Sequence, residues 1–401
     1  MYLPLLFSPL HFVKRGWGEV CHKPAIIVAL MQIGLNAHLL SGRTGYRTAG
    51  IHGYIDGLLH HLPAAVPSDW RLTAFVGAAN TTQIDGLTLR RSRLDTESPL
   101  KRIIWEQAVQ PFDLGGLDLY HALAFVAPLL LNTPSVVTIY DLSFVHYPQR
   151  LPASRRLYLR LLTSLTCRRA RRVIAISHST ARDLVATLHL PSDKIDVAAP
   201  GYNPTVFRPL TASQIASFRH SKNLPDRFWL FIGTLEPRKN LPILLEAYAS
   251  LKSRPPLIIG GGKGWDYAPI FEAVKRHKLE DSVQFVGFIP SEELAIWYNC
   301  AEAFVYPSVF EGFGLPVLEA MACGTPVIVS DASSLPEVAG AAGLCIAPQD
   351  VEGWTAALRR VWEDGEWRSK AREQGFVEAG RYPWSQTAQQ TAQSYRKALS
   401  L

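Results

Sequence analysis

The chain has 401 residues, of which 48% are apolar, 10% aromatic and 19% charged. At roughly 150 residues per domain, this length predicts two or three domains that bury their own cores, and it excludes disordered, collagen-like and coiled-coil proteins. Seven of the 41 basic residues are arginines between positions 155 and 172, and the other 34 are balanced by 34 acidic residues. One basic stripe on an otherwise neutral protein argues against a nucleic-acid partner, which would require a broad basic face.

The cysteines and the most apolar stretch bear on compartment and on membrane insertion. The five cysteines form no C-x-x-C pair and have no histidine at ligand spacing, so neither a zinc site nor a disulfide framework is expected. We therefore expect a cytoplasmic protein. The stretch 25–40 is interrupted by Gln32, Asn36 and His38, so no spanning helix is expected.

Residues 1–30 are expected to be an N-terminal extension outside the fold. Their apolar part contains prolines and precedes its positive charges, whereas a secretory signal has the opposite order. Met31 directly precedes a good strand, so we expect it to be the natural start.

Short apolar strands alternate with helical patterns along nearly the whole chain, which is the signature of parallel βαβ units. The first series has strands at 32–40, 71–78, 117–123, 135–143, 173–178 and 194–201, with helices at 51–61, 152–170 and 179–189. The second series has strands at 228–235, 256–261, 282–288, 303–308, 326–331 and 343–347, with helices at 241–252, 292–300 and 316–322. A segment rich in turn-forming residues, 201–209, separates them.

The predicted fold class is therefore α/β, with two Rossmann-like, doubly wound parallel-sheet domains that face a cleft. We expect a first domain at 31–203, a second at 204–380, and a C-terminal helix within 381–401 that can pack back on the first domain. Open α/β folds place their ligands at the carboxyl ends of the strands. Functional residues are therefore expected in the loops that follow strands.

The segment EGFGLPVLE, from Glu311 to Glu319, follows the fourth strand of the second series. Pro316 suits a first helical turn, so Glu319 is expected one turn inside the helix and Glu311 in the loop before it. Gly312 and Gly314 allow the backbone to approach a ligand closely. Helix N–H groups favour an anion and carboxylates accept hydrogen bonds from sugar hydroxyls, so the segment suits a ligand with both hydroxyls and phosphate. A capped helix with solvated acids explains the pair alone equally well.

The segment GTLEPRKN, from Gly233 to Asn240, lies at the turn between the first strand and the first helix of the second series. Arg238 and Lys239 in such a turn can clamp a diphosphate, the arginine through its planar fork and the lysine as a mobile charge. By itself, such a pair is more typical of a solvated surface.

Together, the two segments resemble the retaining, nucleotide-sugar-dependent glycosyltransferases of family 4, which have the two-domain GT-B architecture. The matching stretches, in the family's order and spacing over residues 228–350, are GTLEPRKNL, VGFIP with a following EL, YPSVFEGFGLPVLEAMACGTPVIVSD and SSLPEVAG.

The resemblance implies roles for individual residues. Arg238 and Lys239 would hold the donor diphosphate, and Glu311 would hydrogen-bond the transferred sugar. Glu319 would take the nucleotide ribose, and the turn that contains Phe288 would lie near the base. The donor-binding positions that the resemblance implies are Gly50, Gly233, Phe288, Gly312, Phe313, Gly314, Leu315 and Glu319.

The N-terminal half matches the family less sharply. The segment 41–54 resembles the family's glycine-containing loop, in which Gly50 would approach the diphosphate, although His52 stands where many relatives have glycine. His121 and Asp141 end consecutive expected strands, where the family often has polar residues near the acceptor, so both are candidate catalytic residues. A structural histidine explains His121 equally well. Ser177 also matches a family position, and it can instead cap the following helix.

The predicted activity is the retaining transfer of a hexose from a nucleotide-diphosphate sugar to a glycan or lipid-linked acceptor, in polysaccharide or glycoconjugate synthesis. The TIYDLSF stretch and the YP after it are most similar to transferases that use GDP-mannose, so mannose is the leading sugar. No cofactor and no metal are expected, because the chain has no D-x-D motif. The alternative is a non-catalytic subunit that binds sugar nucleotides, which would be expected to have lost Glu311, Arg238 or Lys239. A sugar-nucleotide epimerase of the same architecture would have a different acid/base set.

The basic stripe Arg155–Arg172 falls largely on the helix expected at 152–170. Leu157, Leu161 and Leu165 recur there at helical spacing among the arginines. Such a helix can lie on an anionic membrane surface, which would keep the protein peripheral on the inner face of the membrane and would suit a lipid-linked acceptor. The alternative is a helix that packs on its sheet through these leucines, with solvated arginines.

Overall fold

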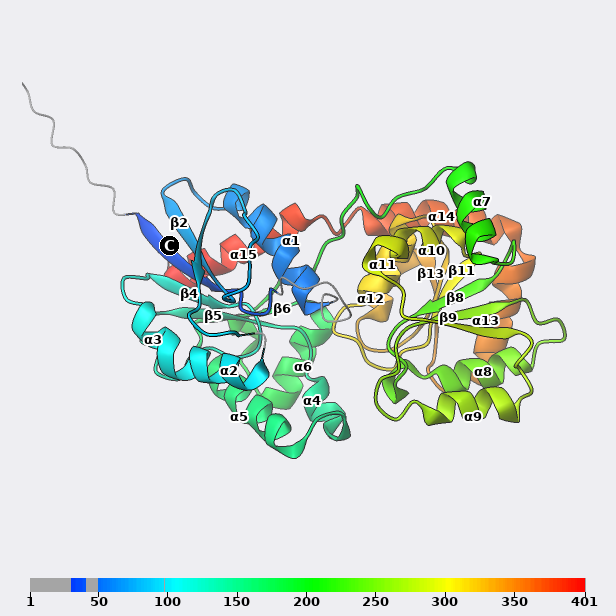
Figure 1. Ribbon diagram of the computed structural model, residues 1–401, viewed down its shortest axis with the longest axis horizontal. Helices are drawn as coiled ribbons and strands as arrows, with labels where there is room; N and C mark the ends of the chain where they lie inside the picture. Colours follow the sequence, from blue (N-terminus) through cyan, green and yellow to red (C-terminus); the bar gives the residue numbers. More distant parts are fainter. Residues whose placement is uncertain (1–29, 41–49, 97, 401) are drawn as a thin grey trace, which may run out of the picture.

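The computed structural model describes residues 30–40, 50–96 and 98–400 (Figure 1). Nearly all of the expected N-terminal extension and most of the expected glycine-containing loop therefore lie outside the described residues. The described chain forms two α/β units that lie side by side (Figure 1).

Seven parallel strands form the first sheet, in the order β3-β2-β1-β4-β5-β6-β7. They are β1 (Met31–Asn36), β2 (Trp70–Val76), β3 (Leu87–Arg91), β4 (Leu119–Ala122), β5 (Ser135–Ile139), β6 (Arg172–Ala175) and β7 (Ile195–Val197). The helices of this part are α1 (Ile51–Ala65), α2 (Pro99–Ile104), the π-helical turn η2 (Trp105–Val109), α3 (Gln110–Asp113), α4 (Ser143–His146), α5 (Ala153–Arg169) and α6 (His178–Leu188).

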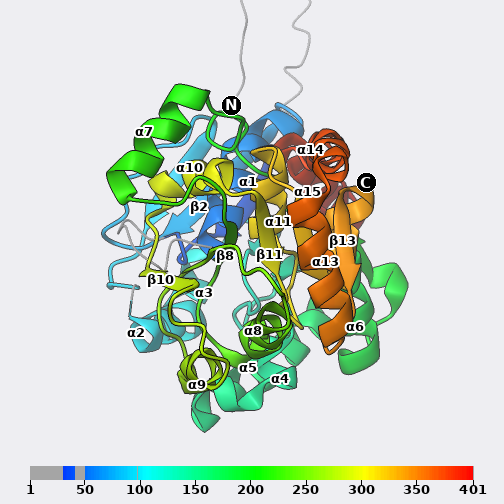
Figure 2. The ribbon, with the colours of Figure 1, turned by 90° about the vertical axis from the view of Figure 1, so that its right-hand side faces the viewer.

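Six parallel strands form the second sheet, in the order β10-β9-β8-β11-β12-β13. They are β8 (Trp229–Ile232), β9 (Leu257–Gly260), β10 (Val283–Gly287), β11 (Ala303–Tyr306), β12 (Val327–Ser330) and β13 (Gly343–Ile346). In Figure 2, α8 (Leu241–Ala249) and α9 (Ala268–Arg276) lie on one side of this sheet, and α10 (Leu294–Cys300) and α11 (Leu315–Ala322) on the other. The remaining helices are α7 (Ala212–Lys222), α12 (Leu335–Ala339), α13 (Val351–Glu363), α14 (Gly365–Ala379) and α15 (Trp384–Leu399).

The predicted fold class is confirmed, and the burial of the strands explains why it could be predicted. Every residue of β8, β11 and β12 is buried, as expected for parallel strands that are covered by helices on both faces. No strand was expected at β3, because this mostly exposed edge strand has the sequence LTLRR and lacks an apolar run. The strand expected at 135–143 is too long, because the chain leaves the sheet after Ile139 and Ser143 begins α4.

The C-terminal helix α15 lies against α1 and the middle of the first sheet (Figure 1). Trp384 packs against Gly57 of α1 so closely that a Cβ atom at Gly57 would lie 2.3 Å from the Trp384 ring. Farther along, the Thr387 hydroxyl donates a hydrogen bond to the carbonyl of Ala199, at 2.5 Å. The chain therefore passes between the two sheets twice, once after β7 and once before α15.

The two domains touch at the loop before α11. A Cβ atom at Gly312 would lie 2.1 Å from the carbonyl oxygen of Tyr140, so only glycine fits at this contact. The Thr180 hydroxyl of α6 lies 3.2 Å from the Tyr140 carbonyl oxygen and 3.1 Å from that of Gly312, and it links the two chain segments.

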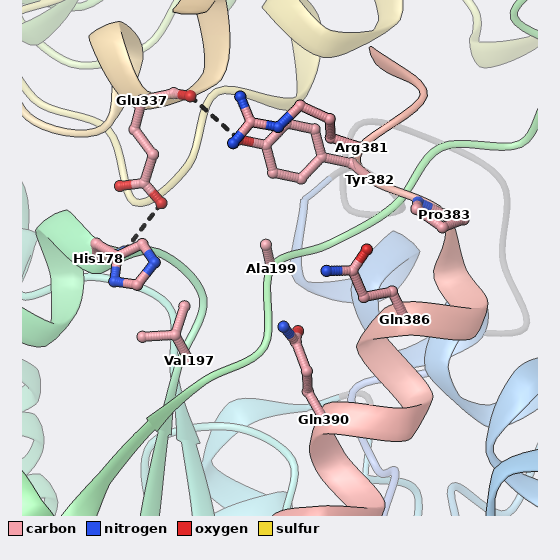
Figure 3. Close-up of a pocket in the computed structure, with 9 residues that line it drawn as sticks. All are labelled: His178, Val197, Ala199, Glu337, Arg381, Tyr382, Pro383, Gln386 and Gln390. Atoms are coloured by element: carbon pink, nitrogen blue, oxygen red, sulfur yellow. Dashed lines mark hydrogen bonds between the residues drawn. The ribbon is translucent and has the colours of Figure 1, made fainter. Parts of the chain in front are cut away.

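A second contact between the domains involves the amino terminus of α6. The Glu337 carboxylate of α12 accepts hydrogen bonds from the amides of His178 and Ser179, at 3.0 and 3.2 Å. Figure 3 shows this contact beside a cavity of about 360 Å³. Both segments that connect the domains line this cavity, one through Ala199 and the other through Tyr382 and Pro383. None of the predicted site residues lines this cavity.

We predict that Glu337→Ala weakens the contact between the two domains, because it removes a carboxylate from two helix N–H groups. Such charge-assisted contacts contribute about 1–2 kcal/mol. Small-angle X-ray scattering is expected to show a larger radius of gyration for this variant. Glu352→Ala, which removes an exposed acid from the first turn of α13, is the matched control. Identical scattering from the Glu337→Ala protein and the unaltered protein would contradict the assigned contact.

Candidate functional site

The two motifs that the sequence analysis singled out lie side by side at the carboxyl edge of the second sheet. β8 and β11 are hydrogen-bonded neighbours. Arg238 and Lys239 follow β8 in the short 3-10 turn η5 (Pro237–Lys239), and Glu311 follows β11. Because parallel strands end at the same edge, residues 72 positions apart in sequence come into contact there.

Glu311 binds both cations directly. One of its carboxylate oxygens accepts a hydrogen bond from Arg238 at 2.8 Å, and the other accepts hydrogen bonds from Lys239 at 2.5 Å and from the Ser308 hydroxyl at 2.6 Å. Arg238 also bonds the Glu236 carboxylate at 2.8 Å. Arg238 and Lys239 are only 8% and 5% exposed, so the structure places an almost completely buried ionic network at this edge.

The charges of this network balance, since two carboxylates face two cations. Burial by itself would raise the pKa of Glu311, but Arg238 and Lys239 outweigh it and hold that pKa at about 2. Burial lowers the pKa of Lys239 to about 8, although Glu311 opposes this shift. For Arg238, the neighbouring carboxylates outweigh burial and raise the pKa. At neutral pH Glu311, Arg238 and Lys239 are therefore all ionised.

Three members of the network were not assigned a role in the sequence analysis. Glu236 bonds Arg238, while the hydroxyls of Tyr306 and Ser308 bond Lys239 and Glu311, respectively. All three stand inside the quoted motifs, so the signal that could have identified them was proximity in sequence, of Glu236 to Arg238 and of Tyr306 and Ser308 to Glu311. Their contacts with the ionic groups could not be derived from sequence spacing.

The loop after β11 differs from its prediction at Gly312. This residue was expected to approach a ligand, but in the structure it lies against Tyr140 of the first domain. Gly314 is the N-cap of α11 and has φ +112, a conformation that favours glycine. Phe313 is buried, with its ring 5.2 Å from that of Tyr382, and Leu315 is the first residue of α11.

Glu319 lies in α11, one turn after its start, as predicted. One of its carboxylate oxygens accepts a hydrogen bond from the Tyr298 hydroxyl at 3.1 Å, and burial raises the pKa of Glu319 to about 8. Phe288 is exposed at the end of β10. Gly233 follows β8, where a Cβ atom would lie 3.5 Å from the Lys239 side chain.

Of the first-domain candidates, Asp141 lies nearest to the network. A Cβ atom on Gly312 would lie 3.3 Å from that of Asp141, and the Asp141 charge contributes to the raised pKa of Arg238. One Asp141 carboxylate oxygen accepts a hydrogen bond from the Ser143 amide at 2.8 Å. The other predicted position on this side, Gly50, has φ +68 and directly precedes α1.

The structure gives His121 a structural position. Its ring has no exposed surface, and its two nitrogens lie 2.7 Å from the Tyr395 hydroxyl and 2.8 Å from the Thr138 hydroxyl. Burial lowers the pKa of His121 to about 3. A ring whose nitrogens are both occupied cannot contact a substrate in this arrangement, so we leave His121 out of the candidate site. Ser177 is the N-cap of α6 and accepts a hydrogen bond from the Thr180 amide at 2.9 Å.

The described residues contain no group of three or more histidines, cysteines or acids that could hold a metal ion. Arginine and lysine side chains can neutralise phosphate, and the carboxylates can accept hydrogen bonds from hydroxyls.

Comparisons with known proteins cover both domains. The family model for glycosyl transferases group 1 matches residues 213–377, and that for glycosyltransferase family 4 matches residues 92–206. The chain is 33% identical to the O-antigen chain mannosyltransferase B of Escherichia coli over 282 residues, which are 69% of this chain and 74% of that protein. It is 29% identical to the serotype-specific mannosyltransferase WbdA of Escherichia coli over 62% of this chain, but spans only 31% of WbdA.

Solved structures share the fold over nearly the whole chain. Sucrose-phosphate synthase from Thermosynechococcus elongatus superposes with a TM-score of 0.72 at 24% identity, covering 92% of this chain and 99% of that one. Anabaena HepE, solved in complex with UDP and glucose, gives a TM-score of 0.71 at 18% identity, covering 92% of this chain and all of that one.

We predict that the buried ionic network is energetically coupled. Glu311→Gln removes the negative charge that pairs with both Arg238 and Lys239. Breaking a buried ion pair in this way lowers the free energy of unfolding by about 3 kcal/mol. In a double-mutant cycle with Lys239→Met, measured by urea denaturation, we expect a coupling energy of about 1–3 kcal/mol.

The matched control for this cycle is the more exposed ion pair of Lys222 and Glu293, whose charged atoms lie 2.9 Å apart. Its cycle, with Lys222→Met and Glu293→Gln, is expected to give less than about 1 kcal/mol. Equal coupling energies for the buried and the exposed pair would contradict the predicted strong coupling between Glu311 and Lys239.

Proposed function

Because the chain belongs to the glycosyltransferases of group 1 and family 4, we propose that it transfers a mannosyl residue from GDP-mannose, with retention at the anomeric carbon, to a glycan or lipid-linked acceptor. The observation that carries this proposal is the buried pair Arg238 and Lys239, which meets Glu311 at the carboxyl edge of the second sheet. The names of these two mannosyltransferases support mannose as the sugar.

In this mechanism the donor's glycosidic bond ionises toward an oxocarbenium-like state, and negative charge grows on the leaving diphosphate. Arg238 and Lys239 neutralise this charge, together with the N–H groups at the start of α11. Since Glu311 and Glu236 already balance the two cations, the diphosphate must compete for them. Donor binding would free the Glu311 carboxylate to accept hydrogen bonds from the sugar hydroxyls.

The acceptor is proposed to enter from the first domain. Asp141 reaches the network beside Gly312, so its carboxylate is positioned to accept a hydrogen bond from an acceptor hydroxyl. Glu319 and Phe288 are proposed for the nucleoside end of the donor, as their positions after β11 and β10 allow. Arg238 and Lys239 neutralise the charge on the leaving diphosphate, so the proposed mechanism needs no metal ion.

We predict that Lys239→Met lowers turnover with GDP-mannose at least about 100-fold, the loss expected when one such stabilising donor is removed. In the unaltered protein, kcat/KM for the donor is expected to fall as the pH rises above about 8, because Lys239 then loses its charge. This decline should be smaller in Lys239→Met, because Glu311 stays ionised throughout that range while Glu319, whose pKa is also about 8, still titrates there.

The assay uses purified protein with GDP-mannose and, for comparison, UDP-glucose, UDP-galactose and GDP-fucose. Lys222→Met, which removes a partly exposed lysine of α7, is the control and should keep full activity. A preference for a UDP-sugar would overturn GDP-mannose as donor, and near-full activity of Lys239→Met would overturn the site.

We further propose that α5 docks the protein on an anionic membrane surface. Leu157, Leu161 and Leu165 are 58%, 52% and 44% exposed along one side of the helix. The alternative in which these leucines pack on the sheet is therefore wrong; the buried residues of α5 are Thr163, Thr166 and Cys167. None of the helices in the described part of the chain has the length and apolar character needed to cross a membrane.

The arginines of the stripe divide into two groups. Arg168 lies on the same side of α5 as the exposed leucines, and Arg160 is exposed on the flank of that side beside Leu157, so both can reach lipid phosphates. Arg168 also donates a hydrogen bond to the Leu188 carbonyl at 3.3 Å. Arg172 instead forms a bidentate ion pair with Asp196, at 2.8 and 2.7 Å, and is mostly buried. It therefore belongs to the fold and not to the docking surface.

We predict that the protein sediments with vesicles that contain phosphatidylglycerol but not with pure phosphatidylcholine vesicles, and that salt weakens this binding. Leu161→Gln combined with Arg160→Gln should reduce the bound fraction, because both apolar area and charge are lost. Val377→Gln, at an exposed apolar position of α14, is the control. Equal binding to both vesicle types would contradict the docking surface.

A further inference from the structure

A cavity of about 180 Å³ lies in the first domain, away from the ionic network of the second. It is formed by residues at or just beyond the carboxyl ends of β1, β2 and β3 and by the segment of η2 and α3. The residues that line it and enter the following argument are His38, Arg90, Arg91, Arg93, Trp105 and Asp113. It therefore opens at the carboxyl edge of the first sheet, on the side of the molecule proposed for the acceptor.

The lining is strongly basic, with three arginines against one acid. Arg90 donates a hydrogen bond to the Asp113 carbonyl at 3.0 Å, and Arg91 donates one to the Asn80 carbonyl at 2.7 Å. Within the described ranges, Arg93 has no hydrogen-bond or ion-pair partner. Each guanidinium carries five N–H donors, so most of the donors around this cavity remain available to a ligand.

His38 adds a buried donor to the same cavity. It is only 5% exposed, and its Nε2 atom has no hydrogen-bond partner among the described residues. Its Nδ1 atom lies 3.4 Å from the Thr96 hydroxyl, which can donate to it and leave the proton on Nε2. Burial and the charge of Arg102 lower the pKa of His38 to about 4, so the ring is neutral and needs no counterion.

We propose that this cavity binds a phosphate group carried by the acceptor, through Arg91, Arg93 and the Nε2–H group of His38. This inference rests on the proposed transferase function. Guanidinium groups present paired N–H donors that match phosphate oxygens, and a buried unpaired donor is costly unless a ligand satisfies it. Trp105, which also lines the cavity, offers an apolar wall to the sugar or lipid next to the phosphate.

Direct binding tests the site independently of catalysis. Pyrophosphate is titrated into the full chain by isothermal titration calorimetry, with GDP present at saturation to occupy the donor site. We expect one pyrophosphate per chain and a Kd at least about tenfold higher in Arg91→Gln/Arg93→Gln. Arg276→Gln, an exposed arginine at the end of α9, is the matched control and should leave the Kd unchanged. Absent binding, or equal Kd values in all three proteins, overturns the site.

Transfer assays then decide whether the phosphate belongs to the acceptor or is a free anion. The same mannosyl acceptor is supplied with and without a diphosphate at its reducing end. For the unaltered protein we expect the acceptor with the diphosphate to have a KM about tenfold lower than the acceptor without it. In Arg91→Gln/Arg93→Gln we expect the two KM values to be equal. Equal KM values for the two acceptors in the unaltered protein, despite pyrophosphate binding, would show that the bound phosphate does not come from the acceptor. Absent transfer to either acceptor would instead count against the proposed function, while the binding result stands.

Discussion

Two cations buried within contact distance of one carboxylate are the constraint on which this molecule depends. Burial of Arg238 and Lys239 requires compensating negative charge, because removing charges from water is costly; Glu311 supplies it to both cations, and Glu236 also pairs with Arg238. The requirement ties the turn after β8 to the loop after β11, and the order of the second sheet makes these strands neighbours. The network is therefore a consequence of the sheet order as much as of the residue types.

The same loop also joins the domains. One residue after Glu311, Gly312 lies against the Tyr140 carbonyl of the first domain, and Thr180 links both segments. Any opening of the domains must move Asp141 away from the cations. For the proposed transfer, this coupling would require the two domains to be in contact when Asp141 and the cations act on the same substrate pair.

The arginines of the first domain differ in what they contact. Arg172 is paired with Asp196 and supports the fold, whereas Arg160 and Arg168 accompany the exposed leucines of α5. Arg91 and Arg93 surround a separate cavity at the sheet edge. These arginines of the first domain therefore have three different surroundings, and only their partners in space distinguish them.

The sequence by itself determined the α/β class, most strands and the helix start at α11, because buried parallel strands are apolar runs and Pro316 with Gly314 marks a helix start locally. It also singled out Arg238, Lys239 and Glu311. Only the tertiary structure decided that these three form one network, that Gly312 contacts the other domain, and that His121 is locked by Tyr395 of a helix 274 residues away. Such contacts depend on which strands become neighbours and where the chain returns, and neither is encoded in the local periodicity of side chains.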